Sequence, residues 1–118
     1  MALAGRSLAA LLVAGGLVAG SPGARAHDYP TAALADYVFG CMATNGQTQE
    51  VLGKCACSID VIASILPFEE YTEAETVLRM RQVPGGGEKM AIFRDTAVAK
   101  SAVERLKRAQ VEAELRCF

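Results

Sequence analysis

Four cysteines constrain this chain more than any other feature of its sequence. They are Cys41, Cys55, Cys57 and Cys117. An even number of cysteines in a short chain that carries an export signal is typical of a disulfide framework. The sequence has no C-x-x-C redox motif and no C-x-x-C-H haem attachment site, and its one histidine makes a zinc site improbable. We therefore expect two structural disulfides.

Residues 1–26 have the pattern of a cleaved secretory signal peptide. Arg6 precedes an uncharged, mostly apolar run from Leu8 to Gly20, and Ala24-Arg25-Ala26 matches an A-x-A cleavage site. The apolar run is shorter than the roughly 20 residues that a transmembrane helix needs. We predict export to the periplasm and a single mature domain over 27–118 without a membrane anchor.

Apolar residues recur at helical spacing from the start of this domain. We expect a first helix before Asn45-Gly46 and a second one from Thr48 to about Leu66. The predicted buried face of the first helix consists of Leu34, Tyr37, Val38, Cys41 and Met42. Asn45-Gly46 is typical of a helix end, and Thr48 suits the cap of the next helix.

The second half of the domain continues the helical pattern. Pro67 starts a third helix that runs to about Arg81, and the glycine-rich segment 83–87 is a connector. A long last helix begins near Asp95 or Thr96. Its predicted seam consists of Ala99, Val103, Leu106, Gln110, Ala113 and Cys117. The sequence thus predicts an all-α fold, a small four- to five-helix bundle stapled by two disulfides.

Helix geometry limits how the cysteines pair. Cys55 and Cys57 lie two positions apart on one helix, so their side chains diverge by about 200° around its axis and should not bond each other. One of them must reach Cys41 and the other Cys117. The short connection between the first two helices favours Cys41–Cys55 with Cys57–Cys117, and the swapped pairing is the alternative.

The residue inventory argues against an enzyme. His27 is the only histidine, and it lies at the predicted end of the mature chain, so a histidine-based catalytic constellation is hard to assemble. After signal removal the domain would carry 13 acidic and ten basic residues. This balance gives no reason to expect nucleic acid as a partner. We expect a non-enzymatic protein without a covalent cofactor.

Carboxylates gather in the middle of the chain, where no basic residue occurs between Lys54 and Arg79. Glu69, Glu70 and Glu73 share one face of the predicted third helix, with Glu75 and Asp60 as weaker candidates. Clustered carboxylates without a cation nearby suit a hard ion such as calcium or a trivalent lanthanide. The alternatives are a solvated helix face or a docking surface for a basic partner.

Several segments resemble a known group of proteins. These segments are Tyr37-Val38-Phe39-Gly40-Cys41-Met42, Cys55-Ala56-Cys57-Ser58-Ile59-Asp60-Val61-Ile62-Ala63, Ala74-Glu75-Thr76 with Met80-Arg81-Gln82, and Arg116-Cys117-Phe118. They are similar to small four-cysteine periplasmic proteins associated with pyrroloquinoline-quinone (PQQ) alcohol dehydrogenase systems of methylotrophic bacteria. The resemblance covers essentially all of 27–118, and it is carried mainly by cysteines and apolar residues.

The resemblance implies a lanthanide- or calcium-binding chaperone of a periplasmic quinoprotein alcohol dehydrogenase system, and it allows for an ion that bridges a homodimer. No ligand position transfers from the resemblance, so Glu69, Glu70, Glu73 and Glu75 are assigned from their spacing alone. One alternative is a metal-free interaction module that docks on the dehydrogenase or its cytochrome. A further alternative is a small periplasmic stress chaperone.

Overall fold

Helices account for nearly all of residues 27–118, the part of the chain that the computed structural model describes. The elements in chain order are α1 (Thr31–Asn45), α2 (Gln49–Ile65), α3 (Phe68–Arg81), the 3-10 turn η1 (Gly87–Met90), α4 (Ala91–Asp95) and α5 (Ala97–Cys117). No strand occurs in this range. The prediction of an all-α fold is confirmed. The predicted signal peptide and its cleavage site lie outside the described residues.

Local side-chain chemistry sets the helix ends. The hydroxyl of Thr48 accepts a hydrogen bond from the Val51 amide at 3.2 Å, which caps α2, and Thr96 caps α5 through the Ala99 amide at 3.3 Å. Gly46 ends α1 with a φ of 113°, a left-handed conformation that favours glycine. The helix bounds also agree with the sequence: α1 ends at Asn45, α3 follows Pro67 and ends at Arg81, and α5 follows Thr96. These predicted ends are confirmed.

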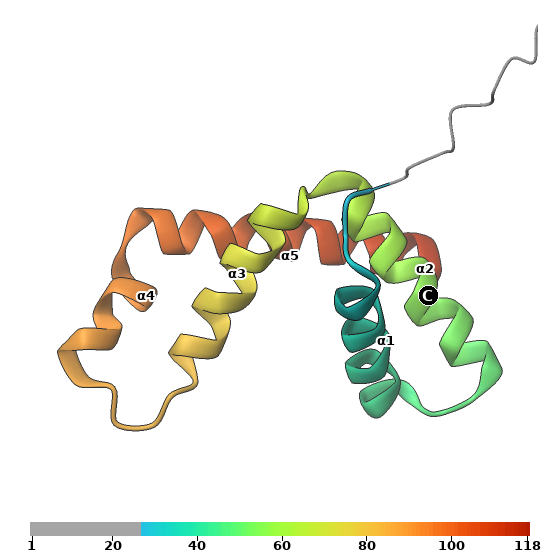
Figure 1. Cartoon of the computed structure of the whole chain (residues 1–118), viewed down its shortest axis with the longest axis horizontal. Helices are drawn as coiled ribbons and strands as arrows, with labels where there is room; N and C mark the ends of the chain where they lie inside the picture. The colour runs from blue at the N-terminus through green and yellow to red at the C-terminus, as the bar shows by residue number, and fades with distance from the viewer. Residues whose placement is uncertain (1–26) are drawn as a thin grey trace, which may run out of the picture.

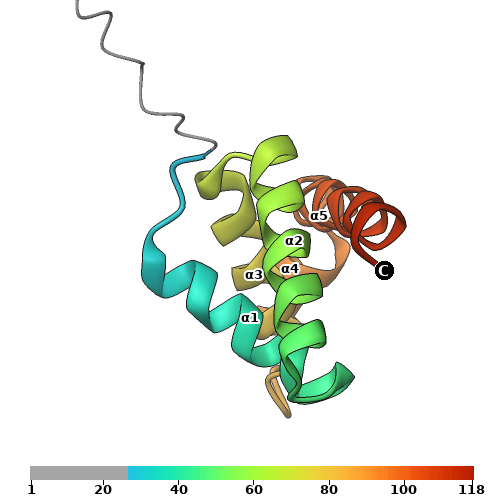
Figure 2. The same ribbon diagram turned by 90° about the vertical axis from the view of Figure 1, so that its right-hand side faces the viewer.

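The long helix α5 connects the two halves of the molecule. Figure 1 shows α1 and α2 beside its C-terminal part, α3 crossing its middle, and α4 folded back near its start. The hairpin of α1 and α2 and the pair of α3 and α4 thus stand on the same side of α5. The view along α5 in Figure 2 shows that α2 lies next to α5 whereas α1 lies farther out.

Small side chains on α5 let the other helices approach it closely. Ala102, Ala109 and Ala113 are at most 1 % exposed, and Leu106 between them is fully buried. The same cluster includes Ile62 of α2 together with apolar residues of α3. In the predicted seam of α5, Ala99, Val103, Leu106 and Ala113 are buried, whereas Gln110 and Cys117 are only partly buried.

Both disulfides form as favoured by helix geometry. Cys41–Cys55 joins α1 to α2, and Cys57–Cys117 joins α2 to the end of α5, each with a Cα–Cα distance of 5.8 Å. The swapped pairing is wrong. Because both bridges involve α2, this helix is tied covalently to its neighbours on either side.

The prediction of a buried face on α1 is wrong in the extent of burial, because the residues of this face are only partly buried. No residue of α1 is buried, and Leu34, Tyr37 and Val38 only pack against the edge of the core. The reason is that α1 packs mainly on α2, so one side of the helix is covered and the rest remains open. This exposure shapes the candidate functional surfaces.

Candidate functional site

The acidic residues predicted to bind a metal ion lie on α3, where they do not form one cluster. Glu70 and Glu73 face α5, and the Arg105 guanidinium lies 3.5 Å from Glu70 Oε2 and 3.8 Å from Glu73 Oε2. The expectation of carboxylates without a nearby cation is therefore wrong for these two residues. The bundle brings Arg105 beside them from a distant part of the sequence.

The other predicted carboxylates point to different places. Glu69 is exposed, Glu75 lies 4.0 Å from Arg79 Nη2 on the side toward α1, and Asp60 lies 3.7 Å from His27 Nε2. Within residues 27–118, no group of three or more His, Cys, Asp or Glu side chains is close enough to hold a metal ion. The structure thus distributes the predicted ligands over separate surfaces.

One face of α1 forms an apolar groove with α2. The groove has a volume of about 490 Å³ and is lined mainly by Leu34, Val38, Phe39, Met42, Leu52 and Ile59. The side chain of Phe39 is 82 % exposed and that of Leu52 is 39 % exposed. Asp60 is the one charged residue among the groove's lining residues.

The opposite face of α1 borders a polar groove shared with α3 and α5. Its two main hollows, of about 390 and 380 Å³, have Tyr37, Cys41 and Asn45 in common. A smaller hollow of about 180 Å³ continues along α3, and it shares Tyr71 with the second hollow. We call the surface formed by these three hollows the polar groove.

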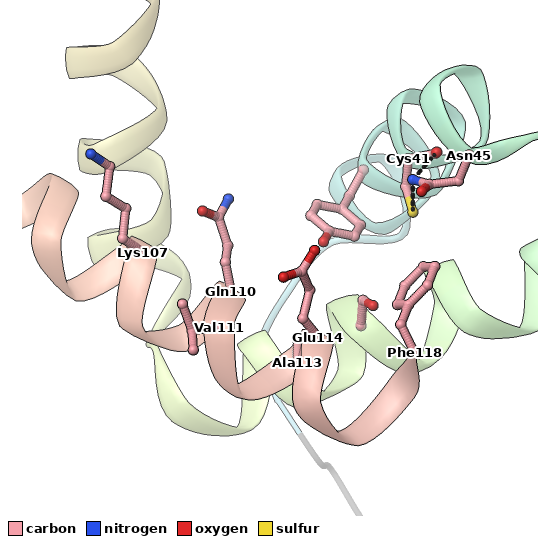
Figure 3. A pocket seen from close by; sticks show the side chains of 10 residues that line it. Cys41, Asn45, Lys107, Gln110, Val111, Ala113, Glu114 and Phe118 are labelled. Carbon is pink, nitrogen blue, oxygen red and sulfur yellow. Dashed lines mark hydrogen bonds between the residues drawn. The ribbon is translucent and has the colours of Figure 1, made fainter.

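Carboxylates from three helices line the polar groove. Asp36 of α1 and Glu75 of α3 line the same two hollows, and Glu114 of α5 lines the hollow at the other end. Figure 3 shows Glu114 projecting from α5 toward the side of the hollow where Asn45 lies, and the amide of Asn45 donates to the Cys41 carbonyl at 2.9 Å. Lys107 lines the hollow that contains Glu114, and Arg79 lines a hollow that contains Asp36 and Glu75, so the groove carries charges of both signs.

Two tyrosines lie in the middle of these carboxylates. Burial raises the pKa of Tyr37, the Glu114 and Glu75 carboxylates raise it further, and the Ser58 hydroxyl opposes the shift. Burial also raises the pKa of Tyr71, with added contributions from Glu75 and Asp36 that Arg79 partly opposes. Both phenols therefore remain protonated and uncharged well above neutral pH.

The hydroxyl groups of the two buried tyrosines, Tyr71 and Tyr29, differ in their hydrogen bonding. The side chain of Tyr71 is 9 % exposed, and its hydroxyl has no hydrogen-bond partner among residues 27–118, whereas the Tyr29 hydroxyl donates to the Leu66 carbonyl. Tyr71 lines the hollows that Asp36 and Glu75 also line, and its hydroxyl is not among the buried atoms that lack a partner.

Sequence reasoning missed this groove. It assigned Tyr37 to a buried face and did not single out Asp36, Tyr71 or Glu114. These residues come from three helices, and no linear motif connects them. The one available signal was Asp36, the single charged residue in the apolar helix α1.

The described part of the chain contains no single helix long and apolar enough to cross a membrane. The pair α2 and α3 meets the criteria of length and composition only when taken together, across a bend of 112°. No protein family model, curated protein or solved structure matches the chain.

Proposed function

We propose that this chain is an exported accessory protein without catalytic activity of its own, and that it docks on another exported protein through the apolar groove of α1 and α2. The observation that carries the proposal is the exposure of α1. Only one of its 15 residues is charged, and none of the 15 is buried. A helix of this composition is ordinarily covered by other protein.

The exposed apolar side chains are contiguous, which supports a binding surface. Phe39 and Leu52 are both exposed and line the same groove, together with half-buried neighbours on α1 and α2. A contiguous apolar patch on a small soluble domain is typical of an interaction site, whereas single exposed apolar residues are not.

The spacing of the lining residues indicates what the groove accepts. Thr31, Ala35, Val38 and Met42 follow one another along α1 at steps of four and three, as do Leu52, Ala56 and Ile59 along α2. Two helices lined in this way accept the apolar stripe of a third helix. Asp60 at the rim is 67 % exposed, so the docking helix should carry a basic residue beside its stripe.

The class of partner follows from the resemblance stated above. It suggests a periplasmic quinoprotein alcohol dehydrogenase or its cytochrome. Two disulfides are compatible with such an oxidising compartment.

The test is binding of the oxidised domain to a purified quinoprotein alcohol dehydrogenase and to its cytochrome, by surface plasmon resonance in excess chelator. Phe39→Ser should weaken binding at least about tenfold, because a buried aromatic anchor carries much of an interface's energy. Leu115→Ser is the matched control, since Leu115 is 77 % exposed on α5 and lies outside the groove. Equal binding by both variants, or no binding of either partner, would overturn the proposal.

A second candidate is the ion-handling function that the resemblance implies, that of a lanthanide chaperone of the LanD type. The favourable observation is that Glu69 and Glu73 are both exposed and lie four positions apart on α3. Because these residues are too few to complete a coordination shell, the ion would need water or a second copy of the chain. Glu70, which lies with Glu73 beside Arg105, would be the flanking ligand, whereas Glu75 faces α1.

Calorimetric titration with La³⁺ and Ca²⁺, combined with size-exclusion chromatography, tests this candidate. Micromolar or tighter binding that is lost in the variant Glu69→Gln with Glu73→Gln would support it. The control is Glu88→Gln with Glu104→Gln, which removes the same charge from exposed positions elsewhere. Absence of heat in the unmodified domain would reject it.

A further inference from the structure

We propose that the apolar groove of α1 and α2 also binds a second copy of this chain, through the outer face of α5. The proposal rests on the docking function proposed above for this groove. A bound second copy covers the groove until another partner displaces it, so self-association regulates access to the docking site.

The outer face of α5 is a second surface that no helix covers. Figure 2 shows α5 at the edge of the molecule, with α2 on one side of it and no helix of residues 27–118 on the other. On this helix Val111 is 57 % exposed, Leu115 77 % and Phe118 54 %. Together with the exposed Arg108 they follow one another at steps of three, four and three, so they form one stripe along the helix. We call these four residues the outer stripe.

The outer stripe has the properties that the groove requires of a bound helix. Its apolar side chains lie on one face, and Arg108 lies beside them at one end. Arg108 forms no ion pair within residues 27–118. Asp60 at the rim of the groove is 67 % exposed, and its one ion-pair neighbour in the same range is His27, at 3.7 Å. The two surfaces therefore complement each other in charge as well as in apolar character.

The two surfaces also match in length. Asp60 and Leu52 line the groove eight positions apart on α2, which corresponds to about 12 Å along the helix. Arg108 and Leu115 lie seven positions apart on α5, which corresponds to about 10 Å. With Arg108 beside Asp60, Leu115 therefore reaches the end of the groove where Leu52 is exposed.

The contact is head-to-tail, because the groove and the outer stripe belong to different parts of the chain. Each copy thus offers one groove and one stripe. The few side chains involved are well below the roughly 20–30 residues a side of a standard interface, and small interfaces are weak and transient. The self-association is therefore weak enough for another partner to displace it.

Sedimentation velocity of the oxidised protein in excess chelator tests the proposal, since the chelator prevents metal-bridged pairing. The sedimentation coefficient of the unmodified protein should rise with concentration. Phe39→Ser in the groove and Leu115→Ser in the stripe should each weaken self-association at least about tenfold, because each removes an apolar anchor. The matched control Val98→Ser should leave it unchanged, since Val98 is 69 % exposed on α5 but lies outside both surfaces. An unmodified protein that stays monomeric into the millimolar range would overturn the proposal.

Mixing the two variants tests the head-to-tail geometry. Phe39→Ser retains an intact stripe, and Leu115→Ser retains an intact groove. The mixture should therefore associate about as tightly as the unmodified protein, although neither variant does so alone. A mixture no more associated than either variant would overturn the proposal, because the two surfaces would then not bind each other.

Exchanging the two charges tests the register. Asp60→Lys and Arg108→Glu should each weaken self-association several-fold, and a chain that carries both changes should regain it, because opposite charges again face each other. Circular dichroism should be unchanged in all three variants, since both positions are exposed. A double variant that associates no better than the single ones would overturn the pairing of the stripe with the groove.

Binding to the dehydrogenase or its cytochrome separates this proposal from the proposed function. Leu115→Ser keeps its own groove, so it should bind the partner at least as tightly as the unmodified protein, whereas Phe39→Ser should lose both associations. Self-association that depends on Phe39 and Leu115, without binding of either partner, would support the second copy alone. Partner binding by a protein that remains monomeric would overturn only the present proposal. Leu115-dependent binding of anionic vesicles by a monomeric protein would also overturn it, because a lipid surface would then be what the stripe contacts.

Discussion

The hydroxyl of Tyr29 donates a hydrogen bond to the backbone carbonyl of Leu66 at 2.7 Å, across 37 positions of the chain. The Tyr29 ring also packs against Phe68 and Tyr71, with each pair of ring centroids 5.1 Å apart. The segment before α1 is therefore fixed to the turn between α2 and α3.

Tyr29→Phe should lower the free energy of unfolding by about 1–2 kcal/mol, because the Leu66 carbonyl would be left buried without its donor. Tyr29→Ala should cost about 3–5 kcal/mol, since it also removes the buried ring. Urea unfolding followed by circular dichroism measures both values. An unchanged midpoint for Tyr29→Phe would show that water replaces the hydroxyl at no cost.

The two disulfides should differ in how much they stabilise the fold. The Cys41–Cys55 bridge spans 14 positions and Cys57–Cys117 spans 60. Loop entropy then predicts losses of about 3 and about 4 kcal/mol for the corresponding double serine variants. Losses of this size approach the total stability of a small domain, so full reduction should unfold it. A reduced protein that keeps its helical signal and its cooperative transition would contradict this prediction.

The alanines of α5 should not tolerate larger side chains. Ala109 is fully buried in the main core cluster. Ala109→Leu should destabilise the protein by about 1–3 kcal/mol, because a close-packed core cannot take up the added volume without shifting its helices. The matched control is Val111→Leu, since Val111 on the same helix is 57 % exposed. Similar unfolding midpoints for both variants would mean that the core is loosely packed.

Stability should fall above about pH 10. Burial raises the pKa of Tyr29, Tyr71 and Tyr37 above the ordinary value of 10.0, so the unfolded chain loses these protons first. The stabilisation is fully present below that value, and it is lost as the pH rises above it. Tyrosinate absorbance near 295 nm should therefore appear together with loss of the helical signal. Titration of the tyrosines near pH 10 with all helices intact would refute this expectation.

Arg105 should limit any binding of ions by α3. It lies within 4 Å of both Glu70 and Glu73, and all three side chains are more than a third exposed. Arg105→Gln should therefore change the free energy of unfolding by less than about 1 kcal/mol. It should raise the La³⁺ affinity several-fold by releasing the two carboxylates. An unchanged affinity would show that Glu70 and Glu73 are not ligands.

The helices and the disulfides could be predicted from the sequence because both depend on local patterns. Thr48, Gly46 and Pro67 mark helix ends through their own backbone and side-chain preferences, whatever the rest of the chain does. The pairing of Cys55 and Cys57 with different partners follows from their divergence on one helix.

The surfaces could not be predicted in the same way, because they depend on which helices meet. Arg105 neutralises Glu70 and Glu73 only after α5 packs on α3. Asp36, Tyr71 and Glu114 line one groove only because α1, α3 and α5 all border it. The exposure of Phe39 likewise depends on a neighbour that α1 lacks.

The Cys57–Cys117 bridge has a further consequence for the covalent structure. It closes the chain into a ring that contains α3, α4, α5 and the glycine-rich connector between Arg81 and η1. A protease that cuts this connector once would open the ring without dividing the molecule, and the two pieces would separate only after reduction. Until then each piece would remain at a high local concentration of the other, so a nicked chain could reassemble as an intramolecular event.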